Sequence, residues 1–129
     1  MNFEEFEKAI RGQDPALGGF DFRRDVFSQI RECTRRLFQV AMRRMNPQKI
    51  RGSFELFGLD FMVDDKLRVF LVECNTSPAL FRKGSHLKAL LPGVIEEVVQ
   101  KALDPHFPPP EDASCPEKLS AFEELEISR

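Results

Sequence analysis

The stretch FELFGLDFMVDDKLRVFLVECNTSPAL, residues 54–80, decides what this chain can fold into. Residues 54–63 and 67–74 are rich in β-branched and aromatic side chains, and each is too short for a helix of that hydrophobicity. The polar residues between them, 64–66, form a turn so short that two strands joined by it must pair antiparallel. The sequence therefore predicts a β-hairpin.

Helical periodicity flanks this hairpin on both sides. Phe3–Ile10 has apolar residues three and four apart and predicts a short amphipathic helix. Asp21 is placed to cap a longer helix that ends before Asn46. After the hairpin, Pro92 suits the first position of a further helix, whose apolar residues continue to Leu103. The expected fold class is α/β, in the sense of α+β, with an antiparallel hairpin flanked by helices.

The composition is that of one ordinary domain. The 129 residues are 42% hydrophobic and carry 19 Lys plus Arg against 21 Asp plus Glu, a formal charge of −2, so disorder throughout is excluded. No apolar run approaches the ~20 residues of a membrane span, and the acidic start differs from a secretory signal. We therefore expect a monomer in the reducing cytoplasm, with its three cysteines as free thiols.

The charges are unevenly distributed along the chain. Residues 23–51 hold nine basic and two acidic side chains, whereas residues 104–129 hold seven acidic and two basic ones. Arg24, Arg31 and Arg35 fall on the outer side of the long helix. Such a surface is typical of a solvated helix face, and it would also attract an acidic partner.

Oxygen-bearing side chains gather at one end of the predicted hairpin. Side chains alternate along a strand, so Glu73 and Asn75 share a face, and a symmetric hairpin places Asp60 directly opposite Glu73. Adjacent carboxylates repel unless a cation lies between them, and two carboxylates with one amide suit Mg²⁺. The alternative is that Asp60 faces solvent and Glu73 merely ends its strand. Apolar residues on both faces of 54–63 favour the metal site, because an unpaired carboxylate is costly on a fully buried strand.

Residues 54–80 resemble the metal-binding segment of the tubulin-tyrosine ligase family, which is an ATP-grasp family. That segment usually reads F-E-L-x-G-x-D-F-x-x-D and then W-L-x-E-x-N-x-x-P, and this chain keeps both runs and the interval between them. Phe70 stands where Trp is usual, and Cys74 replaces an aliphatic residue. The following run HLKALLPGVIEEVV, residues 86–99, is most similar to the branch that includes polyglycylases.

The resemblance implies an ATP-dependent carboxylate–amine ligase that adds glycine, glutamate or tyrosine to a protein carboxylate, usually on tubulin, through an acyl phosphate. It implies that Asp60, Glu73 and Asn75 hold the Mg²⁺ that bridges the ATP phosphates. The implied reaction needs no enzyme nucleophile, and no catalytic residue is identified. Arg82 and Lys83 follow the motif in a loop from which they could contact phosphate or an acidic substrate; the alternative is ordinary solvated charge.

The resemblance also implies partners and a location. The partners are tubulin or microtubules and an amino acid, without nucleic acid or membrane. The location is the cytoplasm and cytoskeleton, including the cilium or axoneme. In this interpretation Arg24, Arg31 and Arg35 attract the acidic tails of tubulin.

The resemblance spans residues 20–104, the carboxyl-terminal part of the catalytic domain. A short helix and loop, residues 1–19, precede it, and a Pro-rich linker with an acidic tail, residues 105–129, follows. Residues 118–129 form either one acidic helix or a frayed tail. Because the family's adenine-binding and phosphate-holding residues lie upstream, we expect a fragment or short isoform that is inactive alone. The alternatives are a noncatalytic microtubule-binding module and a ligase that modifies another protein.

Overall fold

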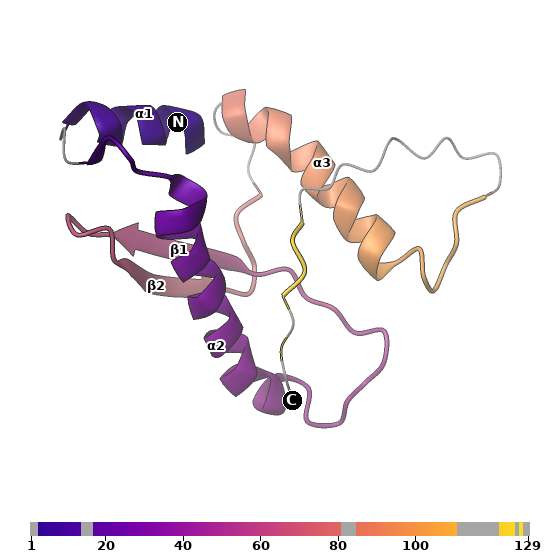
Figure 1. Ribbon diagram of the computed structural model, residues 1–129. Helices are drawn as coiled ribbons and strands as arrows, with labels where there is room; N and C mark the ends of the chain where they lie inside the picture. Colours follow the sequence, from indigo (N-terminus) through magenta and orange to yellow (C-terminus); the bar gives the residue numbers. More distant parts are fainter. Residues whose placement is uncertain (1–2, 14–16, 81–84, 111–121, 126, 128–129) are drawn as a thin grey trace.

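The computed structural model describes residues 3–13, 17–80, 85–110, 122–125 and 127 (Figure 1). Helices and one two-stranded antiparallel sheet make a mixed α/β fold, which confirms the predicted class. Within the described ranges, no helix has both the length and the apolar character needed to cross a membrane. The elements in chain order are α1 (Phe3–Gln13), η2 (Arg23–Phe27), α2 (Ser28–Met45), β1 (Gly58–Val63), β2 (Val69–Asn75) and α3 (Ser85–Ala102).

The buried core lies where α1 meets the start of the long helix. Phe20, Phe22 and Val26 are 2%, 8% and 0% exposed. Phe3 stacks on Phe22 with ring centroids 4.3 Å apart, and Phe6 meets the rings of Phe20 and Phe22 edge-on. The predicted periodicity of the first helix thus places its apolar face on this core.

Both predicted N-terminal helices form. The first extends past its predicted end, to Gln13. The second begins as predicted, because Asp21 Oδ1 accepts a hydrogen bond from the Arg24 backbone N–H at 2.7 Å, and it ends at Met45. Its first turn, η2, is a π-helix.

Two predictions about the second half of the chain are wrong. The third helix begins at Ser85, so Pro92 lies inside it rather than at its start. Residues 87–91 are mostly good helix formers, so the helix continues through the proline although the Lys88 carbonyl loses its usual N–H donor. Residues 122–125 are not helical, so the alternative of an acidic helix is wrong over that range.

The hairpin forms with shorter strands than predicted. Residues 54–57 lie outside β1, because β2 ends at Asn75, opposite Gly58. Asp60 pairs with Glu73 as predicted, but Phe61 pairs with Leu71 because a β-bulge shifts the register by one residue. The symmetric register of the sequence prediction therefore holds at the ligand end and fails near the turn.

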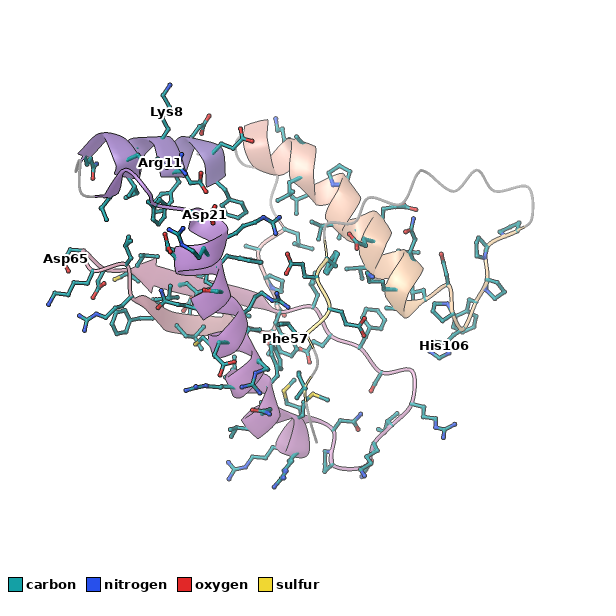
Figure 2. The ribbon with its side chains drawn as sticks, in the orientation of Figure 1. Lys8, Arg11, Asp21, Phe57, Asp65 and His106 are labelled. Carbon is teal, nitrogen blue, oxygen red and sulfur yellow. The ribbon has the colours of Figure 1, made fainter. Side chains whose placement is uncertain are left out.

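The turn of the hairpin is built around Asp64. Its Oδ1 accepts the backbone N–H groups of Lys66 and Arg68 at 3.0 and 2.8 Å, and Leu67 takes a left-handed conformation with φ 59°. A type I turn followed by one left-handed residue is a common hairpin connection. Asp65 lies at the exposed tip (Figure 2).

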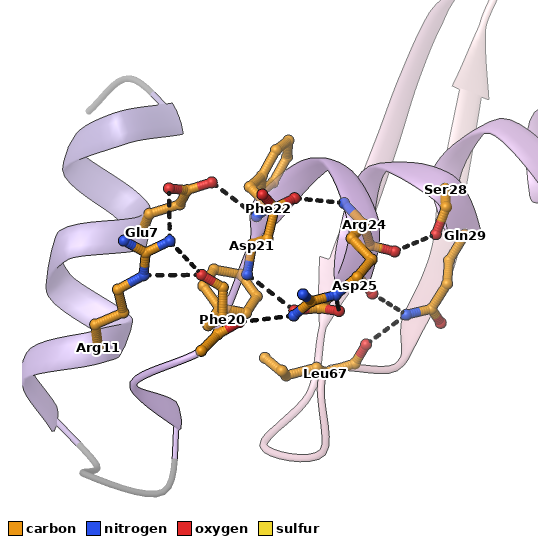
Figure 3. A network of polar contacts seen from close by, with 11 residues as sticks. Glu7, Arg11, Phe20, Asp21, Phe22, Arg24, Asp25, Ser28, Gln29 and Leu67 are labelled. Carbon is orange, nitrogen blue, oxygen red and sulfur yellow. Dashed lines mark hydrogen bonds and ion pairs between the residues drawn. The ribbon is translucent and has the colours of Figure 1, made fainter.

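Gln29 of α2 holds the start of β2. Its Nε2 donates to the Leu67 carbonyl at 2.7 Å (Figure 3). Its Oε1 accepts the Val69 N–H at 3.2 Å. Phe38 of α2 also contacts Phe57, just before β1, with ring centroids 5.2 Å apart. These contacts fix the hairpin against the long helix.

Candidate functional site

The structure brings the three predicted metal ligands together at one end of the hairpin. Asp60 directly opposes Glu73, and Asn75 opposes Gly58. Asn75 Nδ2 donates to Glu73 Oε1 at 3.0 Å, so these two side chains are in contact. All three ligand candidates are exposed residues.

Gly58 allows the chain after β2 to fold back onto β1. A Cβ atom built on Gly58 would lie 2.9 Å from the Cβ of Pro78, which is closer than real side chains approach, and 3.9 Å from the Cβ of Asn75. Gly58 and Pro78 therefore position the end of β2 that carries Asn75. The sequence motif contains both residues, but only the structure shows this contact.

The face that carries Asp60 is open, contrary to the expectation of a strand buried on both sides. Met62, Phe70 and Val72 are 62%, 49% and 59% exposed, whereas Phe61 and Val63 are half-buried. The apolar sequence predicted cover on both faces, but the described part of the chain covers only one. The carboxylates are therefore solvated, so the cost of burying an unpaired carboxylate does not favour a bound cation here.

The chemistry of the donor set fits a hard divalent cation. Asp60 and Glu73 supply carboxylate oxygens, and the Asn75 amide uses its nitrogen for Glu73 while its oxygen can serve as a ligand. In the part of the chain that the structure describes, no three His, Cys, Asp or Glu side chains are grouped to hold a metal. A cation bound here would thus need the Asn75 amide, together with water or phosphate oxygens.

The arginines predicted to bind tubulin form ion pairs with acidic residues of the chain itself. Arg24 donates to both carboxylate oxygens of Asp25, at 2.6 and 2.7 Å (Figure 3). These hydrogen bonds lower the pKa of Asp25 to about 2. Arg31 lies 3.4 Å from Glu123 near the end of the chain.

Arg35 is paired in the same way. It forms a two-point contact with Glu32, both distances being 2.8 Å, and Arg36 adds a third hydrogen bond. The hydrogen bonds from Arg35 and Arg36 lower the pKa of Glu32 to about 2. These internal pairs favour the solvated-face interpretation of the three predicted arginines.

Cations without such partners among the described residues lie in the last turn of α2 and in the loop that follows it, where the sequence analysis named no site. Three of them line a hollow of about 890 Å³ together with apolar side chains. In the sequence, these cations are marked only by their place in the second half of residues 23–51, where basic side chains predominate. Among the described residues, no acid pairs with Arg43, Arg44, Lys49 or Arg51. Arg82 and Lys83 lie outside the described residues.

Comparisons with known proteins agree with the motif on the hairpin. The protein polyglycylase TTLL10 of Macaca fascicularis is 43% identical over 53 residues, which are 41% of this chain and 9% of the relative. The inactive polyglycylase TTLL10 of Homo sapiens is 42% identical over 53 residues, 41% of this chain and 8% of the relative. A probable tubulin–tyrosine ligase of Schizosaccharomyces pombe is 28% identical over 105 residues, 80% of this chain and 26% of the relative.

The chain spans between 8% and 26% of the length of these relatives. The family model described as the tubulin-tyrosine ligase family matches residues 21–115, which include the hairpin, the long helix and α3. Since this match covers most of the chain, the chain belongs to the tubulin-tyrosine ligase family.

Proposed function

We propose that this chain is the metal-binding part of an ATP-dependent ligase that joins an amino acid to a carboxylate of tubulin. The observation that supports it is the placement of Asp60 opposite Glu73, with Asn75 hydrogen-bonded to Glu73. These side chains would hold Mg²⁺ against the ATP phosphates, where the cation would neutralise charge during phosphoryl transfer. Bound ATP would supply the phosphoryl group that activates the acceptor carboxylate.

The relatives' names support this class of reaction. Besides the polyglycylases and the probable tubulin–tyrosine ligase, a tubulin glycylase of Tetrahymena thermophila is 34% identical over 59 residues, 46% of this chain and 6% of the relative. Glycine and tyrosine are therefore the amino acids to test first, with glutamate as a third candidate. We place the reaction on microtubules in the cytoplasm, including those of cilia.

A noncatalytic microtubule-binding role is the second candidate. Two observations favour it: the ligand face is open in the described part of the chain, and one relative is named an inactive polyglycylase. The cations of the last turn of α2 and of the loop after it, unpaired in the described part of the chain, would supply electrostatic attraction to acidic tubulin tails, and such attraction weakens with salt.

The metal assignment can be tested with Mn²⁺ as the probe. NMR spectra of the labelled chain, with ATP present, should show paramagnetic broadening centred on the amides of Asp60, Glu73 and Asn75. Asp60→Asn should abolish this pattern. Asp65→Asn should keep it, because Asp65 lies at the opposite end of the hairpin (Figure 2). Equal broadening in wild type and Asp60→Asn would refute the metal site.

The two candidate functions differ in a tubulin assay. Because the 129 residues alone are expected to be inactive, the chain is extended upstream to the length of its relatives and incubated with tubulin, ATP and radiolabelled glycine or tyrosine. Binding to microtubules is followed by cosedimentation. Incorporation that Glu73→Gln abolishes would support the ligase. Cosedimentation that decreases with salt, without incorporation in either protein, would support the noncatalytic role.

A further inference from the structure

The segment of residues 122–125 and 127 contacts α3 and two arginines of η2 and α2. The Phe122 backbone N–H donates to both oxygens of Glu97, a side chain of α3 that is 5% exposed, at 3.1 and 3.2 Å. The Glu123 carboxylate lies 3.0 Å from Arg23 and 3.4 Å from Arg31. Figure 1 shows this segment, in yellow, running from α3 towards the C-terminal end of α2.

The last described residue of this segment reaches the hollow beyond α2. Ile127 lines the hollow together with the side chains of the α2 end and the loop that follows it. Ile50 is 59% exposed and Met42 45% exposed, so the hollow keeps accessible apolar surface. We call this site the basic hollow; its lining includes Met42, Arg43, Lys49, Ile50, Arg51 and Ile127.

The basic hollow combines two kinds of recognition. The cations Arg43, Lys49 and Arg51 attract carboxylates, and the apolar side chains accept a branched aliphatic residue. The chain's own C-terminal sequence Phe-Glu-Glu-Leu-Glu-Ile, residues 122–127, contains both features. It is therefore a model for the ligand that this surface would take.

We propose that the basic hollow and the adjoining face of α2 dock an acidic peptide, and that residues 122–125 and 127 occupy this surface as an internal competitor. The segment is tethered to the surface, so its effective concentration is on the order of millimolar. Individually weak, exposed ion pairs then suffice to keep it bound. The inference rests on the proposed function only in naming the partner, an acidic tubulin tail.

A peptide fits this surface better than a nucleic acid. Asp25 and Glu32 interrupt the arginines of the helix and pair with them. Outside the hollow, the helix therefore offers few free cations for the successive phosphates that a nucleic acid would present. The aliphatic contact supplied by Ile127 likewise has no counterpart in a phosphate backbone.

Fluorescence anisotropy tests the competition directly. The probe is a fluorescein-labelled peptide of six glutamates that ends in isoleucine, used with the full chain and without ATP or metal. Glu123→Gln removes the carboxylate that pairs with Arg23 and Arg31, so the peptide should bind about two- to fivefold more tightly. Glu124→Gln is the matched control, because Glu124 is exposed and forms no ion pair in the described part of the chain.

A second variant tests the site itself. The double change Arg43→Gln and Lys49→Gln should weaken peptide binding several-fold and reduce its dependence on salt. Equal affinities for Glu123→Gln and Glu124→Gln would overturn the internal competitor. Unchanged binding by the double variant, or tighter binding of a labelled single-stranded oligonucleotide at the same salt, would overturn the peptide site. Because no ATP or metal is present, these outcomes are independent of the Mn²⁺ test.

Discussion

The N-terminal region, residues 3–13 and 17–27, and the hairpin of β1 and β2 are each stabilised by different kinds of contact. In the N-terminal region, buried rings surround Val26, and polar side chains hold the backbone around them: Arg11 Nε donates to the Phe20 carbonyl, and Glu7 accepts the Phe22 N–H, both at 2.8 Å (Figure 3). The hairpin is held by its own backbone ladder and by contacts of Val63, Leu67 and Val69 with the core, while the face that carries Asp60 is open to solvent.

The residues by which the family is recognised are therefore different from the residues that form the buried core. The hairpin carries the motif by which the family is recognised, yet in the described part of the chain its ligand side chains form one hydrogen bond, from Asn75 to Glu73. The buried core consists of residues that belong to no motif. A substitution can therefore destabilise the fold without touching the candidate site, and a change in the site can leave the fold intact.

One of the two largest expected effects comes from the buried end of the long helix. Val26→Ala removes two methyl groups from a fully buried position and should lower the free energy of unfolding by about 2 kcal/mol. Val40→Ala, the same change on the same helix at a position that is 78% exposed, should change it by less than about 0.5 kcal/mol. Urea unfolding followed by circular dichroism measures both, and equal losses would mean that the N-terminal core does not dominate stability.

Two glycines offer the same substitution with opposite expected signs. Gly58→Ala forces a Cβ against Pro78 and should destabilise the hairpin by about 1–3 kcal/mol. Gly12→Ala, in α1, meets nothing within 4 Å and should stabilise the helix by about 0.5–1 kcal/mol. If Gly58→Ala were neutral in thermal unfolding, the close approach of Pro78 to β1 would not be a constraint.

A smaller effect is expected at the hairpin turn. Asp64→Ala removes the acceptor for the Lys66 and Arg68 amides, so these amides should exchange with solvent several-fold faster. Asp65→Ala makes the same change one residue later, where the side chain accepts no hydrogen bond in the described part of the chain. Hydrogen exchange followed by NMR measures the exchange rates of these amides in both variants. Equal exchange rates would show that the turn does not need its aspartate.

The smallest effect is a pH dependence confined to the N-terminal region. The pKa of Asp25 is lowered to about 2 in the folded chain, first by the hydrogen bond from Arg24. The ionised carboxylate therefore adds stability above about pH 4, and this contribution is lost as the pH falls towards 2. The stability difference between wild type and Asp25→Asn should shrink over that interval.

The control for this titration is Asp65→Asn, since Asp65 forms no ion pair in the residues that the structure describes. A constant difference for Asp25→Asn over the same interval would contradict the lowered pKa.

Local patterns predicted much of this molecule. Apolar spacing predicted α1 and the long helix, and alternation with a short turn predicted the hairpin and the pairing of Asp60 with Glu73. The β-bulge beyond that pair could not be predicted. It adds a residue to β2, and Leu67 in the turn is left-handed, but neither feature changes the alternation of side chains that the sequence shows. The predicted start of α3 was wrong, because a proline is found in the first turn of helices and is sometimes also tolerated in their interior, where Pro92 lies.

The site was predicted less completely than the fold. The motif identified the ligand candidates but not the contact between Gly58 and Pro78, since that contact depends on where the chain turns after β2. The internal pairing of Arg24, Arg31 and Arg35 was also missed. A charge count cannot show which acids lie within reach, and the partner of Arg31 is 92 residues away in the chain.

Gln29 has a consequence for association between copies of the chain. A two-stranded sheet exposes unpaired backbone groups along both edges, and such edges recruit strands from other molecules. The two hydrogen bonds from the Gln29 amide occupy the outward-facing carbonyl of Leu67 and N–H of Val69. An incoming strand would have to displace them before it could extend the sheet from this end. The side chain that fixes the hairpin on α2 thereby also protects the start of this edge against aggregation.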